Sequence, residues 1–133
     1  MGDASRKVLS PLWQKAGAKE REAINPDNWV FDQALLNRPA TQDYQVDLRE
    51  DCKTNIALYP DWQAAFRKRQ PKTLIVWGKN DPFFTPAGAR AYLKDLPDAK
   101  LVWLDAGHFV LDENTPRVAA EIKAAFGSAL ECS

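Results

Sequence analysis

The sequence predicts a mixed α/β fold, in which a helical segment over residues 1–69 precedes a strand–helix–strand–helix unit over residues 70–133. Two observations predict this division. Before residue 70 the apolar residues recur at helical spacing. After it, two short runs rich in β-branched and aromatic residues are each followed by an amphipathic segment. Strands in that order are expected to run parallel and to be joined by a right-handed crossover helix.

Three helices are predicted in the first segment. The first begins at the turn Asn25-Pro26-Asp27 and ends at Arg38-Pro39, because the residue before a proline disfavours helical backbone. The second carries an apolar face and is expected to end at Pro60, which cannot donate a helical hydrogen bond. The residues of that face are Tyr44, Leu48, Cys52, Ile56 and Tyr59. The third helix is short, and Asp61 is its capping residue.

Two strands are predicted in the second segment. Residues 73–77 form an apolar run that ends at Gly78 and is typical of a strand buried on both faces. Residues 100–104 form the second strand. Because two strands alone do not make a stable sheet, we expect them to be one edge of a larger sheet.

The helices of this segment have clear start signals. Thr85 and Pro86 suit the capping position and the first turn of a helix that ends at Pro97. The triplet Asn114-Thr115-Pro116 predicts the start of the last helix, and Gly127 predicts its end.

Composition excludes several functional classes. Lys and Arg number 18, as do Asp and Glu, so the chain lacks the positive charge that holds nucleic acid. No apolar run is long enough to cross a bilayer, so no membrane partner is expected. Cys52 and Cys132 lack the spacing of metal or redox motifs, and there is one histidine. We therefore expect no cofactor, no metal site and a reducing, cytoplasmic setting.

Two polar loops follow the predicted strands, at residues 78–82 and 105–109. The carboxyl ends of parallel strands meet at one edge of a sheet, with neighbours about 4.8 Å apart. Asp81 and His108 are therefore expected to meet. A carboxylate fixes the tautomer of a histidine and stabilises its charged form, so His108 would be suited to act as a base near neutral pH. The same residues also suit a turn and a solvated loop, and the pattern leaves both interpretations open.

These segments resemble a known family. The stretch Leu-Ile-Val-Trp-Gly-Lys-Asn-Asp-Pro-Phe-Phe at residues 74–84, with Asp-Ala-Gly-His-Phe at residues 105–109, is similar to the end of α/β-hydrolase fold proteins. Residues 55–63, Asn-Ile-Ala-Leu-Tyr-Pro-Asp-Trp-Gln, resemble the segment that leaves the helical cap in the epoxide hydrolase and haloalkane dehalogenase branch. The resemblance extends over residues 25–127.

The resemblance implies a partial α/β-hydrolase fold, with a helical cap-like segment over residues 1–69 and the C-terminal part of the hydrolase domain over residues 70–133. It also implies that Asp81 is the acid and His108 the base of a catalytic site. The implied reaction is hydrolysis of an epoxide, a haloalkane or haloacetate, or an ester. The implied substrate of the complete family member is a small apolar organic molecule.

Aromatic residues near the loops are candidates for substrate binding. Tyr59, Phe83 and Phe109 are predicted to serve this purpose, because they leave the cap-like segment or flank the loops. A cap tyrosine polarises the epoxide oxygen in the epoxide hydrolase branch, which suggests that role for Tyr59, although Tyr59 before a proline also suits the end of a helix. Core positions are preferred for Trp62 and Phe84, because aromatic residues dominate core burial.

The nucleophile motif of this fold, Gly-x-nucleophile-x-Gly, does not occur in the 133 residues, because no two of the six glycines are four positions apart. We therefore expect a truncated hydrolase that lacks its nucleophile elbow and is inactive as a single chain. The alternatives are a non-catalytic binding module and an inactive fragment. An exposed sheet edge would favour self-association or a complementing chain.

Overall fold

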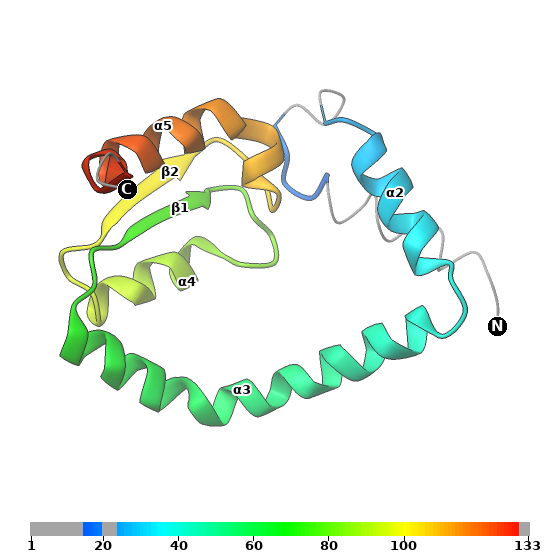
Figure 1. Ribbon diagram of the computed structural model, residues 1–133, viewed down its shortest axis with the longest axis horizontal. Coiled ribbons are helices and arrows are strands. Elements are labelled where there is room, and N and C mark those ends of the chain that lie inside the picture. Colours follow the sequence, from blue (N-terminus) through cyan, green and yellow to red (C-terminus); the bar gives the residue numbers. More distant parts are fainter. Residues whose placement is uncertain (1–14, 20–23, 131–133) are drawn as a thin grey trace.

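The structure is a computed structural model, and it describes residues 15–19 and 24–130. Figure 1 shows the arrangement of the helices and strands. In chain order they are α2 (Asp27–Leu36), α3 (Thr41–Arg69), β1 (Leu74–Gly78), α4 (Pro86–Ala91), the short 3₁₀ helix η1 (Tyr92–Lys94), β2 (Lys100–Leu104) and α5 (Val110–Leu130). Cys52 is exposed on α3 with a free thiol, whereas Cys132 lies outside the described residues.

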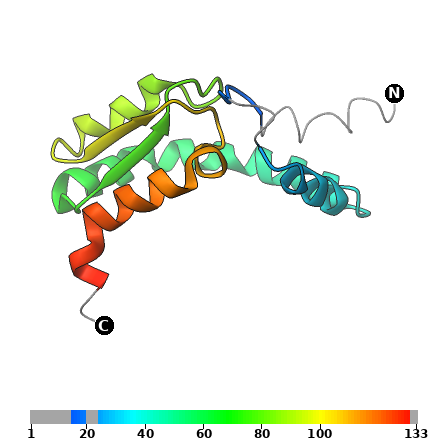
Figure 2. The same cartoon turned by 90° about the horizontal axis from the view of Figure 1, so that it is seen from above.

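The two strands form a parallel pair, as predicted. Leu74 lies opposite Lys100 at one end of the ladder, and Gly78 lies opposite Leu104 at the other. The sheet is placed between α4 and α5, which cover its two faces (Figures 1 and 2). This three-layer arrangement is the mixed α/β architecture that the sequence predicts.

The core lies between the sheet and α5. Leu104, Ala106 and Val118 are buried there, and the neighbouring apolar side chains of both strands and α5 pack against them. On the other face, Ala89 of α4 has no exposed surface. The first strand is nevertheless not buried along its whole length, as Ile75 is buried but the residues beside it are half-buried. A sheet of two strands is too narrow to enclose every side chain.

Before residue 70 the described chain contains the helices α2 and α3 and no strand. The first predicted helix is confirmed as α2. It starts at Asp27, whose backbone N–H donates to the side-chain oxygen of Asn25 at 2.9 Å. It ends at Leu36, just before the Arg38-Pro39 pair that was expected to stop it.

The predicted break at Pro60 is wrong, because α3 runs through this residue as one helix of 29 residues. The fixed φ of proline fits a helix, so Pro60 removes one hydrogen bond while the turns on both sides continue. The helix ends instead at Arg69. The capping residue Gln70 adopts a left-handed backbone (φ 43°) and donates its N–H to the Phe66 carbonyl at 2.9 Å. The short separate helix expected after Asp61 is therefore the last part of α3.

The later helices differ from the predictions at their ends. Thr85 and Pro86 begin α4 as expected, but α4 is short and continues as the 3₁₀ turn η1. Helix α5 spans Val110–Leu130 but is kinked at Asn114, which has non-helical backbone angles (φ −139°, ψ 34°). Its longer second part therefore begins at the predicted triplet, after a short helical part that the sequence did not predict. Gly127 does not end the helix, and its backbone has open space where a side chain would lie.

The helical segment exposes large apolar side chains, because α3 meets the rest of the fold mainly at its C-terminal end. There Arg67 pairs with Asp95 at 2.6 Å, and the side chain of Gln70 donates to the Asp95 carbonyl at 2.8 Å. The exposed apolar residues of α2 and α3 are Val30, Phe31, Tyr44, Val46, Leu48, Ile56, Leu58, Tyr59 and Trp62. The core position predicted for Trp62 is therefore wrong.

No helix in the described part of the chain has an apolar stretch that could cross a membrane.

Candidate active site

The two loops after the strands are joined by backbone hydrogen bonds that extend the ladder. The N–H of Lys79 donates to the Leu104 carbonyl at 3.0 Å, and the N–H of Asn80 donates to the Ala106 carbonyl at 3.1 Å. The acid-bearing loop (residues 78–84) is therefore held against the histidine-bearing loop (residues 105–109) before any side chain is involved. We call them the acid loop and the histidine loop.

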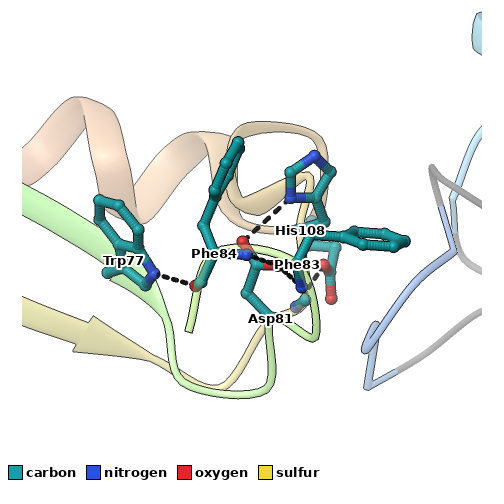
Figure 3. Close-up of polar contacts among 7 residues, drawn as sticks. Trp77, Asp81, Phe83, Phe84 and His108 are labelled. Atoms are coloured by element: carbon teal, nitrogen blue, oxygen red, sulfur yellow. Dashed lines mark hydrogen bonds and ion pairs between the residues drawn. The ribbon is translucent and has the colours of Figure 1, made fainter. Parts of the chain in front are cut away.

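Asp81 and His108 meet where these loops face each other, as the sequence predicts (Figure 3). The ring nitrogen Nδ1 of His108 lies 3.0 Å from Oδ2 of Asp81. The Asp81 side chain is 6% exposed and that of His108 is 15% exposed. A carboxylate this deeply buried needs partners for its charge. Its other oxygen, Oδ1, accepts the N–H groups of Phe83 at 2.8 Å and Phe84 at 3.0 Å.

Three phenylalanine rings surround the imidazole. The ring centroids of Phe83, Phe84 and Phe109 lie 5.1 to 5.2 Å from that of His108. Phe84 is held there because its carbonyl accepts the indole N–H of Trp77 at 2.8 Å (Figure 3). The core position expected for Phe84 is wrong: the residue is 60% exposed, since the acid loop lies at the edge of the sheet and not beneath it.

Tyr59 is the one predicted site residue that the structure does not bring to the pair. It lies on α3, which runs apart from the two loops along the lower side of the molecule in Figure 1. Its ring contacts Trp62, three residues further along the helix, at a centroid distance of 5.5 Å. It is 47% exposed. A role for Tyr59 in substrate binding stays a prediction.

Gly78 allows the two loops to approach through their backbones. A Cβ atom at this position would lie 2.1 Å from the Gly107 carbonyl oxygen and 2.7 Å from that of Ala106. Both obstacles are backbone atoms, which cannot swing aside as a side chain can. The last position of β1 therefore requires glycine so that the acid loop can reach the histidine loop.

Residues 15–19 cross the histidine loop, a contact that the sequence analysis did not foresee. The N–H of His108 donates to the Ala16 carbonyl at 2.9 Å. Gly17 has a left-handed backbone (φ 73°), and a Cβ atom there would lie 2.0 Å from the Asn80 carbonyl oxygen. Gly107 is equally confined, since its Cβ would lie 2.1 Å from the Ala16 oxygen. The small residues at 16–18 are the one sequence signal for such a close approach.

Asp105 forms a polar cluster at the start of the histidine loop. It accepts the side-chain amide of Asn80 at 3.0 Å and pairs with Lys19 at 3.2 Å and Lys79 at 3.4 Å. The hydrogen bond from Asn80, and after it the one from Lys19, lower the pKa of Asp105 below its ordinary value of 3.8. The cluster ties the acid loop and residues 15–19 to the end of β2.

Glu113 is a second carboxylate that sequence reasoning missed. It lies in the first turn of α5, and its oxygen Oε1 accepts the N–H of Gly107 at 2.7 Å. Its other oxygen, Oε2, accepts the N–H of Lys19 at 3.2 Å. The available signal was an acidic residue one turn after the histidine loop, where a helix start favours negative charge.

The arrangement is suited to moving a proton. A histidine held by a carboxylate through one ring nitrogen can exchange a proton at the other near neutral pH. Both side chains are largely buried, and charges interact more strongly away from water than in it. In the described ranges, 15–19 and 24–130, no three His, Cys, Asp or Glu side chains are grouped so that they could hold a metal ion.

Comparison with known proteins finds related sequences. The sequence profile of the alpha/beta hydrolase fold family matches residues 10–115. A protein of Saccharomyces cerevisiae described as an uncharacterized hydrolase is 38% identical over 110 residues, which cover 83% of this chain. The chain spans 38% of the length of that curated relative. No solved structure matches the chain.

The close approach at Gly78 predicts that Gly78→Ala destabilises the protein. The added methyl group would force the two loops apart, and overpacking of this kind costs about 1–3 kcal/mol of unfolding free energy. Urea denaturation measures the change. Gly88→Ala is the matched control, because a Cβ at Gly88 meets nothing within 4 Å and alanine favours the helix. Equal stability of the two variants would contradict the account.

The Asp105 cluster predicts a contribution to stability that depends on pH. Because the folded-state pKa of Asp105 is lowered, its carboxylate stabilises the folded chain above the unfolded-state pKa. The contribution is lost as the pH falls through the lowered folded-state value. We expect Asp105→Asn to be less stable than the unmodified chain at pH 7, and the difference to disappear between about pH 5 and pH 2.

Denaturation of both proteins across that pH range measures the effect. Asp98→Asn is the control, because Asp98 is an exposed aspartate in the loop before β2 and makes none of these contacts. A stability difference between Asp105→Asn and the unmodified chain that stays constant down to pH 2 would refute this assignment.

Proposed function

Because the chain belongs to the α/β-hydrolase fold family, we propose that His108 is the base of a hydrolase and that Asp81 orients it. One observation carries the proposal. The Nδ1 atom of His108 lies 3.0 Å from Oδ2 of Asp81, and both side chains are largely buried at the carboxyl edge of two parallel strands. The acid precedes the histidine in the chain, which is the order of the catalytic residues in this fold.

The proposed chemistry follows from the contacts of the pair. With its proton on Nδ1 and directed at Asp81, the imidazole of His108 carries its lone pair on Nε2. That nitrogen takes a proton from water or from a hydroxyl group, and the Asp81 carboxylate stabilises the imidazolium that forms. The N–H groups of Phe83 and Phe84 hold the carboxylate in place during this step.

The nucleophile is proposed to come from residues other than these 133, since no Gly-x-x-x-Gly spacing occurs among them. An aspartate nucleophile would form an ester intermediate, which water activated by His108 would hydrolyse. A serine nucleophile would instead be deprotonated by His108. The resemblance at residues 55–63 favours the first course and so an epoxide, haloalkane or haloacetate substrate, with an ester as the alternative.

A small apolar substrate is the class that the proposed site favours. The rings of Phe83, Phe84 and Phe109 stand beside the imidazole and would exclude water from an apolar group bound there. Residues 1–69 are proposed to form part of the cap over such a substrate, and residues 70–133 carry the pair.

The test is hydrolysis of an aryl ester, an aryl epoxide and a haloacetate. The chain is assayed alone and mixed with the portion of the yeast relative that lies outside the match. We expect turnover in the mixture only. His108→Ala and Asp81→Asn should each lower it at least about 100-fold, the usual contribution of a positioned base. Asp98→Asn, an exposed carboxylate elsewhere, should retain it.

Two outcomes would contradict the proposal. One is turnover by the mixture that survives the loss of His108. The other is a mixture that forms a stable complex but hydrolyses none of the three substrates.

A binding role is the second candidate, and the exposed apolar surface favours it. Among the described residues, β1 and β2 pair with each other only, so each strand leaves one edge without a neighbouring strand. The apolar side chains of α2 and α3 are exposed as well, including Phe31 at 65% and Ile56 at 63%. Such surfaces bind other chains or aggregate. The proposed partner is a complementing chain or a second copy of this one.

Association is tested by sedimentation and by binding of an apolar dye. We expect the unmodified chain to self-associate or to bind the dye, and Leu48→Glu combined with Ile56→Glu to weaken both effects, because these exposed side chains lie on α3. Gln63→Glu adds a charge to the same helix at an exposed polar position and serves as the control. A monomer that binds no dye would exclude this candidate.

A further inference from the structure

Glu113 joins two segments that lie far apart in the sequence. Its carboxylate accepts the N–H of Gly107 through one oxygen at 2.7 Å and the N–H of Lys19 through the other at 3.2 Å. Gly107 immediately precedes His108, whereas Lys19 is 94 residues away from Glu113. The side chain thus links the start of α5, the histidine loop and residues 15–19.

The same two segments are joined at other points. The N–H of His108 donates to the Ala16 carbonyl at 2.9 Å, and the ammonium group of Lys19 pairs with Asp105 at 3.2 Å. The contact between the backbones is close, because a Cβ at Gly107 would lie 2.1 Å from the Ala16 oxygen. The backbone on both sides of the His108 amide is therefore fixed by residues 15–19 and by Glu113 together.

The two acceptor oxygens give Glu113 a particular chemistry. Hydrogen bonds from N–H groups to a carboxylate are shorter and stronger than those to a neutral acceptor. Glutamine at this position would keep one acceptor oxygen and turn an NH₂ group toward the second N–H, which would then have no acceptor. Glu113→Gln thus removes one of the two hydrogen bonds and keeps the size of the side chain.

We propose that Glu113 is a positioning residue for His108. It fixes the peptide before His108 so that the imidazole is directed at Asp81, and it makes this orientation depend on residues 15–19. The importance of the orientation for catalysis rests on the proposed hydrolase function, but the orientation itself does not.

The test compares the unmodified chain with Glu113→Gln by NMR hydrogen exchange. His108 is the one histidine of the chain, so its ring nitrogens give unambiguous signals. We expect the Gly107 amide proton and the His108 Nδ1 proton both to exchange at least about tenfold faster in Glu113→Gln, as expected for a lost hydrogen bond to a charged group. Asp112→Asn is the matched control, because Asp112 is an exposed carboxylate in the same turn.

The amide of Val102 in the middle of β2 distinguishes a local effect from general unfolding, and it should exchange at the same rate in all three proteins. Unchanged exchange at Gly107 and at Nδ1 in Glu113→Gln would overturn the proposal. If that variant does not fold, the exchange rate of the Gly107 amide in the unmodified chain is the test. Exchange as fast as in an unfolded chain would overturn the proposal, and protection of this amide would support the proposal. No substrate is needed, so a failure of the hydrolysis assay leaves this result unaffected.

Discussion

The backbone contact between the acid loop and the histidine loop is the constraint on which the rest of the site depends. The parallel ladder brings the loops to one edge, and the bonds of Lys79 and Asn80 carry the pairing beyond the strands. Gly78 then admits the Gly107 carbonyl at a distance that no side chain would allow. Asp81 can reach His108 only because the two backbones already touch.

Burial and electrostatics act together once this contact is made. The Asp81 carboxylate loses water but gains two backbone N–H donors and the imidazole of His108, so its charge is compensated on three sides. The Phe83, Phe84 and Phe109 rings surround the imidazole and leave little room for solvent to compete with the pair. The hydrogen bonds and aromatic contacts that stabilise the Asp81–His108 pair also suit the imidazole to exchange a proton.

Sequence reasoning predicted those parts of the fold that local signals determine. The bounds of β2, the start of α4 at Thr85-Pro86 and the meeting of Asp81 with His108 follow from strand patterns, turn chemistry and the direction of parallel strands. It failed at Pro60, because the helical turns on either side stabilise α3 more than the one hydrogen bond that proline cannot donate destabilises it. It failed for Trp62 and Phe84, because exposure depends on what lies opposite a side chain, which periodicity does not contain.

The contacts of residues 15–19 and Glu113 were beyond sequence reasoning for a different reason. Each of them has a backbone atom as donor, acceptor or both, and backbone atoms are the same at every position. The small residues at 16–18 and an acidic residue after the histidine loop were the available signals, and neither identifies its partner. His108 is consequently held by three segments, which are the acid loop, residues 15–19 and the start of α5. The pattern of strands and helices predicted only the contact with the acid loop. This also explains why a chain with so small a sheet can hold a buried carboxylate–imidazole pair in place.

The central claim is that Asp81 holds His108 in the tautomer with its proton on Nδ1. The most direct measurement is the pair of ring nitrogen chemical shifts of this single histidine, recorded by NMR at a pH where the ring is neutral. The account predicts the Nδ1–H tautomer in the unmodified chain and a mixture of tautomers in Asp81→Asn. The same tautomer ratio in both proteins would contradict it.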